Sequence, residues 1–588
     1  MIFGNFDFNM DTVIDLPTEE VNQDNRSLVT GGLYVLTVFM AAVMRLSGLE
    51  SVPLSPTEAI QALNVWQNMQ PGNTAVSIQS PAYFSLTSLF MAFFGDSDMT
   101  ARLVPALFGI GLVLLPWFLR ERLGSMGALV TAVLLAISPL NAVVSRTVGG
   151  DALAIFAVGL TAVALIRTYD TQSKPWRYIL AIAIGLGITS APLFYTGLIT
   201  LMLAGLLSQF VGPKLNNEEV FSIERDLWGT MAVFFFVTAL LLSTRFLTYL
   251  PGIGAAAGIF GDWITQFTSS GGLQQLLEPF LALVRYELVL VILGIFAILW
   301  AVWRNQPLGT LLVYWLTGAL IILLLQRGTL NNTLIITLAS YLLLGLFTNH
   351  ILRKAITWHS WLMAAILALL GGAIVVNIAR FLRTSVYGTE LANIWMSLII
   401  FVVATFALYF MWIWSETAVI QGSLLAVLIL LSIYQWGTAW NLTHTNGNNP
   451  QERWVTTATA DSLPLMASTL RDVSRQVVGS DYDINIHSAV DTPALRWYLR
   501  DFQQAQFGNT LPPGTQTAAL ITPKSMAEPF LGSDYLGSDF DLTTSGTATL
   551  VSSETPVQDT LRFWFFHESN MQPERDGVIL WVRADLIQ

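Results

Sequence analysis

The sequence predicts a mostly α-helical polytopic membrane protein that ends in a small C-terminal α/β domain. Of its 588 residues, 54% are hydrophobic and only 11% are charged, and the mean hydropathy is +0.59. This composition is typical of polytopic membrane proteins. Apolar runs recur between residues 28 and 436, whereas after Asn441 they become short and Asn, Thr, Asp and Pro become common. The change in character predicts a membrane domain followed by a soluble domain.

Composition also excludes several functional classes. The chain contains no cysteine, which excludes disulfides, thiolate catalysis and cysteine-based metal sites. A net charge of -11 argues against nucleic acid as a partner, because nucleic-acid binding needs a basic face. The N-terminus lacks a basic region followed by an apolar run, so we expect no cleaved signal peptide.

The chain divides into three predicted parts. Residues 1–27 form an acidic cytoplasmic tail, residues 28–436 a transmembrane domain with an outer loop at 47–101, and residues 437–588 a soluble α/β extracytoplasmic domain. A helix needs about 20 apolar residues to cross a bilayer. On this measure we predict about thirteen spans, at 28–46, 102–119, 126–141, 151–167, 177–190, 192–211, 228–247, 285–303, 308–326, 331–349, 357–377, 393–414 and 417–436.

Basic residues in short loops predict the orientation of these spans. Arg120 and Arg122 fall in one loop, and Arg167, Lys174 and Arg177 in another loop on the same side. Cytoplasmic loops carry an excess of Lys and Arg. The N-terminus is therefore expected in the cytoplasm, and the first loop and the C-terminal domain outside a cell membrane.

Shorter elements are predicted on the outer side. In the first loop, Ile60, Leu63 and Trp66 recur at helical spacing, which predicts an amphipathic helix over Ala59–Met69 that lies on the membrane surface. The C-terminal domain is expected to contain helices at 463–478 and 493–500 and strands at 484–486, 517–522 and 577–582. Trp497 and Tyr498 fit a domain core better than a carbohydrate platform.

Polar motifs stand where apolar segments end or begin, and such residues are functional candidates in a membrane protein. They are Ser55-Pro56-Thr57-Glu58, Pro81-Ala82-Tyr83, Gly95-Asp96-Ser97, the run from Arg102 to Ala106, and Ser145-Arg146 followed by Asp151. Their order resembles the GT-C membrane glycosyltransferases of the protein-O-mannosyltransferase and aminoarabinose-transferase type (family 39-like). The subgroup of flippase-activity-associated proteins is the nearest. The resemblance covers about residues 30–210, and Trp497-Tyr498-Leu499-Arg500-Asp501-Phe502 also resembles that subgroup.

The resemblance implies transfer of a sugar from a polyprenyl-phosphate donor to an acceptor on the outer face. It assigns catalytic carboxylates to Glu58 and Asp151, and substrate binding to Tyr83, Arg102 and Arg146. The family's first motif is Asp-Glu, but Thr57 occupies the place of the Asp that the family uses as its base. Either Glu58 takes over as base, or the protein is a relative that no longer transfers sugar.

Arginines at the outer rim are candidates for binding the donor phosphate, because the guanidinium fork matches phosphate geometry. Each of them could instead extend to lipid headgroups or pair with a nearby glutamate. For the set as a whole we expect one or two to hold phosphate. The set comprises Arg146, Arg285, Arg327, Arg380 and Arg383. A divalent cation, Mg²⁺ or Mn²⁺, is the one cofactor this chemistry could use, although no residue is assigned as a metal ligand.

Two structural alternatives and two functions remain open. Glu58 fits a helix cap as well as a base, and Asp151 could simply begin a helix. The first function is a lipid-linked-sugar-dependent glycosyltransferase. The second is a non-catalytic membrane subunit that scaffolds membrane-protein partners through its outer domain. The enzyme is preferred, and it requires Glu58, Asp151 and at least one arginine to line one cavity.

Overall fold

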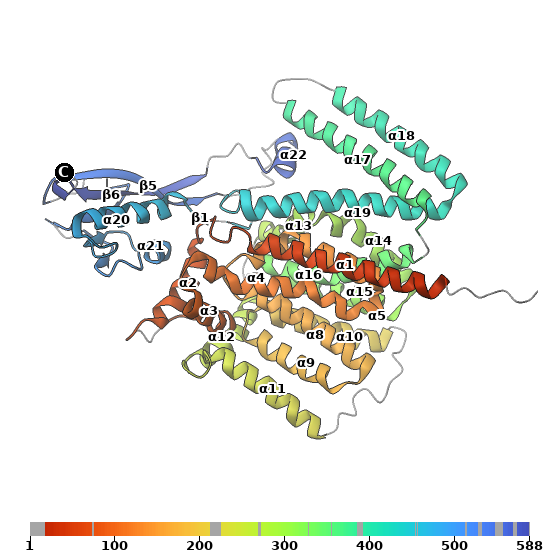
Figure 1. Cartoon of the computed structure of the whole chain (residues 1–588), viewed down its shortest axis with the longest axis horizontal. Helices are drawn as coiled ribbons and strands as arrows, with labels where there is room; N and C mark the ends of the chain where they lie inside the picture. Colours follow the sequence, from red (N-terminus) through yellow and green to blue (C-terminus); the bar gives the residue numbers. More distant parts are fainter. Residues whose placement is uncertain are drawn as a thin grey trace, which may run out of the picture.

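The computed structural model describes residues 18–72, 76–211, 225–268, 272–326, 329–353, 356–384, 392–452, 454–455, 457–511, 514, 516–526, 532–546, 557–568 and 573–586. Helices fill the chain as far as residue 445, and a six-stranded sheet with helices follows at one end of the helical part (Figure 1). The predicted fold class is therefore confirmed. Most of the predicted acidic tail lies outside the described residues, and α1 begins at Thr18.

Nineteen α-helices are found in the described residues before the sheet. They are α1 (Thr18–Leu46), α2 (Pro56–Met69), α3 (Pro81–Phe94), α4 (Asp98–Leu114), α5 (Arg120–Leu123), α6 (Ser125–Ile137), α7 (Pro139–Ser145), α8 (Asp151–Thr171), α9 (Lys174–Ile188), α10 (Leu193–Val211), α11 (Arg225–Ser243), α12 (Gly252–Thr265), α13 (Leu273–Tyr286), α14 (Leu288–Arg304), α15 (Pro307–Leu325), α16 (Thr333–Leu352), α17 (Trp358–Thr384), α18 (Ala392–Trp414) and α19 (Glu416–Trp440).

Eight helices in the described residues are long and apolar enough to cross a membrane, or up to ten if each of two bent pairs is one span. The pairs are α6 with α7, bent by 60°, and α13 with α14, bent by 96°. The predicted number of thirteen is higher because it also counts α9 and two shorter apolar helices, Pro192–Ser208 and Trp228–Ser243. Each predicted span is helical, but these three helices are too short to count by length and composition.

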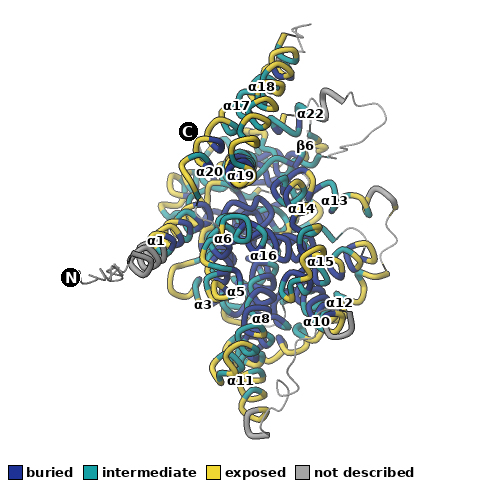
Figure 2. The backbone as a smooth tube through the Cα atoms, turned by 90° about the vertical axis from the view of Figure 1, so that its right-hand side faces the viewer, coloured by how far each residue is buried: buried dark blue, intermediate teal, exposed yellow. Residues whose placement is uncertain are grey.

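Helix α16 lies at the centre of the helical part, where buried residues concentrate, whereas α17 and α18 are largely exposed (Figure 2). Glycines let α16 approach α6: a Cβ on Gly345 would come within 2.5 Å of the Gly127 carbonyl oxygen. Small residues at helix contacts allow close backbone packing in membrane proteins. Thr131 adds a hydrogen bond of 3.1 Å to the Tyr341 carbonyl.

Glu287 stands at the break between α13 and α14, fully buried. Its Oε1 accepts hydrogen bonds from the Ser138 hydroxyl (2.6 Å) and the Leu140 amide (3.3 Å). Its Oε2 accepts from the Tyr341 hydroxyl and from the Gln435 amide (2.6 Å). The donors lie at the α6–α7 break, on α16 and on α19. One carboxylate therefore joins both bent helix pairs, and the four bonds offset the cost of burying it.

The first outer loop contains α2 and α3. Pro56 begins α2 and Ser55 caps it, with the Glu58 side chain returning to the Ser55 amide in a capping box. The expected helix is therefore present, and it buries Ala59, Ala62 and Leu63. Its position relative to a membrane surface stays a prediction.

The C-terminal sheet has the strand order β1-β5-β6-β4-β2-β3. Strands β1 (Thr457–Thr459), β5 (Tyr535–Ser545), β6 (Glu574–Arg583) and β4 (Ala519–Pro523) pair antiparallel, while β2 (Ile486–Ser488) pairs parallel with β4 and with β3 (Ala505–Phe507). The helices of this region are α20 (Ser462–Val478), α21 (Pro493–Tyr498) and α22 (Val557–Phe566). The two predicted helices correspond to α20 and α21, and the three predicted strands to β2, β4 and β6.

Polar bonds join the sheet region to the first outer loop and the start of α4. Trp497 Nε1 and the Tyr498 hydroxyl each donate to the Asp98 carboxylate at 2.7 Å. The Leu54 amide donates to the Tyr498 hydroxyl at 2.9 Å. Trp497 is fully buried, as expected for a core residue. These bonds fix the sheet region against α2, which it contacts through α21.

Candidate functional site

A cavity of about 440 Å³ lies between the start of α2, the loop from α7 to α8 and the segment after α19. Glu58 and Asp151 both line it, although 93 positions separate them in the sequence. The other polar side chains around it include Thr57, Gln61, Arg102, Arg146, Asn331, Asn448 and Glu452. The two carboxylates expected in one cavity are therefore brought together.

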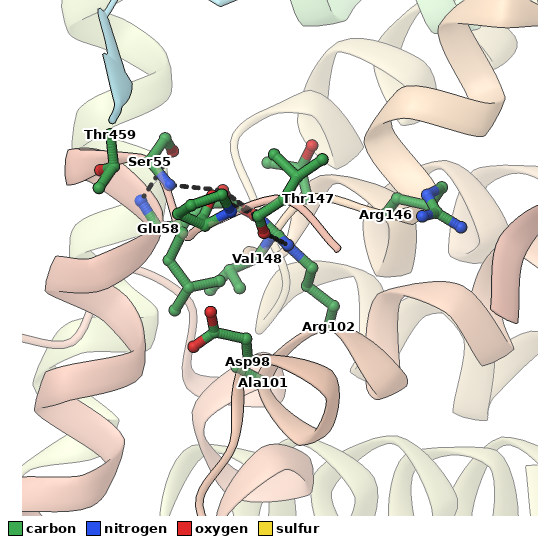
Figure 3. A network of polar contacts seen from close by, with 12 residues as sticks. Ser55, Glu58, Asp98, Ala101, Arg102, Arg146, Thr147, Val148 and Thr459 are labelled. Carbon is green, nitrogen blue, oxygen red and sulfur yellow. Dashed lines mark hydrogen bonds and ion pairs between the residues drawn. The ribbon is translucent and has the colours of Figure 1, made fainter. Parts of the chain in front are cut away.

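Glu58 is buried, and both oxygens of its carboxylate are occupied (Figure 3). Arg102 donates from Nε to Oε1 at 3.0 Å and from Nη2 to Oε2 at 2.8 Å. The Val148 amide donates to Oε1 and the Ser55 amide to Oε2, both at 2.9 Å. Four donors leave this carboxylate little capacity to accept a proton from a substrate.

The electrostatics of Glu58 agree with this geometry. Burial alone would raise its pKa, but the charge of Arg102 and the hydrogen bonds from Arg102, Val148 and Ser55 together hold the pKa below its ordinary value. A general base works best when its pKa lies near the operating pH. The arrangement of Glu58 thus favours the capping and pairing alternative over the catalytic one.

Arg102 is equally saturated. Besides its two bonds to Glu58, it donates from Nη1 to the carbonyls of Leu49 (2.9 Å) and Val52 (2.5 Å) and from Nη2 to the carbonyl of Pro53 (3.2 Å). All five N–H groups of its guanidinium therefore have protein acceptors. Arg102 shapes the turn before α2 and holds no N–H free for a phosphate.

Arg146 has a different environment. Its Nη1 and Nη2 donate to carbonyls at the end of α1 and just beyond it, those of Met44, Arg45, Ser47 and Gly48, at 2.6–3.3 Å. No hydrogen bond within the described residues uses its Nε–H or its second Nη2–H. Burial, and secondly the charge of Arg102, lower its pKa to about 10, so it stays charged at neutral pH. Arg146 is therefore a cation at the cavity wall with unused donors.

Asp151 is the first residue of α8, and Asn331 Nδ2 donates to its Oδ2 at 2.7 Å. Within the described ranges its carboxylate forms no ion pair and accepts no other hydrogen bond. The two residues before Asp151 must be glycines for the backbone to follow this path. Gly149 has a φ of 150°, and a Cβ on Gly150 would come within 2.2 Å of the Ser190 carbonyl oxygen. Of the two predicted catalytic carboxylates, Asp151 is the one with capacity to accept a proton.

The remaining predicted binding residues do not line this cavity. Tyr83 is buried and donates to the Ala101 carbonyl at 2.9 Å. Arg285 pairs with Glu452 at 3.1 Å, behind the cavity wall. Arg380 and Arg383 lie on α17, where Arg383 stacks on the ring of Phe566. Arg327 lies outside the described residues.

Several cavity residues were not predicted from the sequence. Glu452 accepts from the Tyr286 hydroxyl (2.6 Å) and from His567 as well as from Arg285, which places a second neutralised carboxylate in the wall. Asn331 and Asn448 come from loops that are distant in sequence. The clusters Asn331-Asn332 and Asn446-Gly447-Asn448-Asn449 beside apolar spans are the one signal that could have indicated them.

The cavity does not fit a divalent-cation site. Hard cations need several free oxygen ligands. Of the three carboxylates among the described residues of the wall, Glu58 and Glu452 are each paired with an arginine, and only Asp151 remains. In the described parts of the chain, no three His, Asp or Glu side chains are grouped so that they could hold a metal.

Comparison with known proteins supports the resemblance seen in the sequence. The sequence model of the dolichyl-phosphate-mannose-protein mannosyltransferase family matches residues 78–240, a stretch that contains Arg146 and Asp151 but not Glu58. No curated protein matches the chain at a significant level.

Solved structures resemble the whole fold. ArnT from Cupriavidus metallidurans bound to undecaprenyl phosphate aligns with a TM-score of 0.55 at 14% identity, over 94% of this chain and 99% of that chain. Its apo form aligns with a TM-score of 0.53 at 12% identity, over 95% and 99%. An oligosaccharyltransferase of Archaeoglobus fulgidus with zinc and sulfate aligns with a TM-score of 0.44 at 11% identity, over 84% and 68%. The chain is therefore a multi-pass membrane protein with the fold of the GT-C glycosyltransferases, and its residues 78–240 match their dolichyl-phosphate-mannose-protein mannosyltransferase family.

Proposed function

We propose that the protein transfers a sugar from a polyprenyl-phosphate donor to an acceptor hydroxyl at the outer face of a cell membrane. The observation that carries the proposal is the cavity wall, which holds both the positively charged Arg146 and Asp151, whose carboxylate accepts one hydrogen bond, from Asn331, within the described residues. The ArnT structure that this fold resembles was solved with undecaprenyl phosphate bound.

Asp151 is proposed as the general base. The acceptor oxygen attacks the anomeric carbon of the donor sugar and forms the new C–O bond. The bond between that carbon and the donor phosphate oxygen breaks, and the phosphate keeps the electron pair. Asp151 takes the hydroxyl proton, and a single displacement of this kind inverts the anomeric configuration. Asn331 orients the carboxylate through Oδ2 and leaves Oδ1 for the proton.

Arg146 is proposed to stabilise the leaving phosphate. Arginine suits this task because it stays charged and presents two N–H groups along one edge. Its unused Nε–H and Nη2–H form such an edge, whereas the N–H groups of Arg102 are all bonded to protein. Glu58 and Arg102 are then positioning residues: Glu58 accepts from the Val148 amide and so holds the loop that carries Arg146 and Asp151.

We propose that the lipid chain binds in a groove on the end of α19 and the helical residues that follow it, on the side away from the cavity. A groove of about 520 Å³ is lined by Ile433, Trp436, Gly437, Trp440, Asn441 and Thr445. Leu442 and Thr443, from the same segment, line the cavity. A polyprenyl chain in this groove would lie within one helix diameter, about 10 Å, of the cavity that receives its phosphate.

The proposed orientation has the cavity outside and the N-terminus in the cytoplasm. It is supported by the basic residues at the opposite end of α8 from Asp151, where Arg122 pairs with Asp170 and Arg167 pairs with Glu121. Positive loops favour the cytoplasmic side. A reporter that is active only in the cytoplasm, fused after Gln588, should be inactive, and an active fusion would overturn the orientation.

The test of the transferase is an assay of purified protein with a panel of polyprenyl-phosphate sugars, in which release of polyprenyl phosphate is measured. Asp151→Asn should reduce transfer by about 100-fold or more, the usual contribution of a general base. Asp170→Asn, at the other end of the same helix, is the matched control and should stay active. Equal transfer by wild type and Asp151→Asn would refute the assignment of the base.

A second candidate function is favoured by Thr57. The cavity wall holds a threonine at the position where the resembled family has its catalytic Asp, so the protein could be a non-catalytic subunit that scaffolds membrane proteins. If wild type binds polyprenyl phosphate but transfers sugar from no donor in the panel, this second function replaces the first.

A further inference from the structure

A second hollow, which we name the outer groove, lies between α2 and the segment 496–507 of the sheet region. Its volume is about 610 Å³. One wall comes from the second half of α2, with Trp66, Gln67 and Gln70, and the opposite wall comes from residues around α21 and β3. Figure 1 shows α2 and α21 side by side, as their contacts require.

Hydrogen bonds join the wall from the sheet region to the loop before α4 and to the first residue of α4. Arg500 donates from Nε to the Asp96 carboxylate at 2.8 Å and also bonds the Asp96 carbonyl, and it stacks on the ring of Trp497 at 4.0 Å. Asp98, two residues further, receives the bonds from Trp497 and Tyr498. The outer groove is therefore part of a bonded junction and not a loose gap between two parts of the chain.

The side chains in the outer groove combine aromatic rings with uncommitted polar groups. Trp66 and Phe507 are half-buried and both line the groove, and the Arg496 guanidinium lies over the Phe507 ring. The side-chain amides of Gln67 and Gln503 form no hydrogen bonds within the described residues. The carboxylate of Asp501 faces solvent there without a hydrogen-bond partner in the described segments, and partial burial raises its pKa.

This combination fits a neutral carbohydrate better than other ligands. A pyranose ring presents apolar C–H groups on its faces, which pack on aromatic rings, and hydroxyls on its edges, which bond amides and carboxylates. An anionic ligand is disfavoured because Arg496 and Arg500 already pair with Asp491 and Asp96. An apolar ligand would leave Asp501 and the glutamines desolvated without partners.

The outer groove and the cavity of the proposed reaction site share α2 as part of their walls. Gln61 lines the cavity, and Gln67 lines the groove, six residues further along the same helix. At 1.5 Å per residue these two positions are about 9 Å apart along the helix axis. A ligand of several sugar units could therefore lie in the groove while its end reaches the cavity.

We propose that the outer groove binds a neutral oligosaccharide, and that the acceptor of the proposed transferase is the end of such a glycan chain. The second clause rests on the proposed function, whereas the first does not. Trp66 supplies the stacking surface, and Asp501 and Gln67 bond the sugar hydroxyls.

Binding of a glycan panel to the purified full-length protein tests the proposal without any need for transfer. Titration calorimetry with linear neutral hexasaccharides should show saturable binding to wild type. Trp66→Ala should weaken it about tenfold, Asp501→Asn should weaken it by several-fold, and Trp66→Phe, which keeps an aromatic ring, should retain most of it. Asp472→Asn, an exposed acid on α20 away from the groove, is the matched control and should bind like wild type.

The outcomes separate this proposal from the function. If no neutral glycan binds wild type more tightly than Trp66→Ala, or if Trp66→Ala binds as wild type does, the outer groove is not a carbohydrate site. If Asp151→Asn still binds glycan while neither it nor wild type transfers sugar, the groove stands and the proposed transferase fails. If transfer occurs and Trp66→Ala leaves the KM for a glycan acceptor unchanged, the groove does not bind the acceptor.

Discussion

Glu58→Gln provides the sharpest test of how the cavity is built. The substitution keeps the shape of the side chain but removes its charge and places an amide N–H₂ opposite N–H donors. Arg102, buried with it, then loses its ion-pair partner. The four donors around Glu58 predict that the stability of this variant is reduced.

The size of the effect follows from the pair. Removing one partner of a buried ion pair costs about 3–5 kcal/mol, because the remaining charge stays uncompensated. Arg102→Met should cost a similar amount, since it also leaves the carbonyls of Leu49 and Val52 without donors. The double variant holds neither charge, so its loss should be about 3 kcal/mol smaller than the sum of the single losses.

Thermal unfolding in detergent measures stability, and sugar transfer per folded molecule measures catalysis. Glu50→Gln changes an exposed glutamate in the same loop, and it is the control that should leave both unchanged. If Glu58→Gln unfolds within about 0.5 kcal/mol of wild type, the described pair does not stabilise the loop, and the reasoning from it is refuted. A folded double variant without activity, beside an active wild type, would instead return the role of base to Glu58.

Three further predictions follow from the same contacts. The pKa of Glu58 is lower in the folded protein than in the unfolded chain. Its contribution to stability is therefore complete above the ordinary glutamate pKa of about 4.3 and is lost as the pH falls through the lowered value. The melting temperature of wild type should fall more steeply with acid than that of Glu58→Gln. Thr57→Asp, which adds a carboxylate to the wall at the position of the resembled family's Asp, should raise the rate of transfer by about tenfold or more if the site is catalytic, and an unchanged kcat would contradict this. Glu287→Ala should destabilise the membrane domain by about 3 kcal/mol, and by more than Glu287→Gln does, because alanine leaves four hydrogen-bond donors unpaired. Equal melting temperatures for the two variants would show that these hydrogen bonds do not stabilise the fold.

The helices were largely predictable, because their signals are local. The predicted helix at 493 begins where α21 begins, after Thr492, and α2 begins at Pro56, three residues before the predicted start at Ala59. The two sharp bends were less visible, since they depend on Glu287 meeting donors from α16 and α19, which no local pattern reveals. Strand β5 was missed because Gly537, Asp539 and Asp541 lower its strand propensity, and pairing with β6 stabilises it instead.

The site was predictable in part. The order of motifs indicated Asp151 and Arg146, and the structure places both in one wall. The order of motifs could not indicate that Arg102 donates hydrogen bonds to both carboxylate oxygens of Glu58. The position of the Arg102 guanidinium depends on the carbonyls of the turn from Leu49 to Pro53, which accept its other hydrogen bonds. No pattern in the sequence distinguished one outer-rim arginine from another as a ligand of the donor phosphate. Tertiary packing pairs Arg285 with Glu452 instead.

The ion pair between Glu58 and Arg102 can form during synthesis before the rest of the cavity has been made. The wall of the cavity is complete only when Glu452 has been made, roughly 400 residues after Glu58. Ribosomes add about 5–20 residues per second, so about 20–80 s pass between the synthesis of Glu58 and that of Glu452. During that interval Glu58 needs only Arg102, 44 positions further along the chain, to neutralise it. An early partner of this kind lets the first helices insert without an unpaired buried charge, and a variant that lacks Arg102 should be recognised by quality control before the outer domain is made.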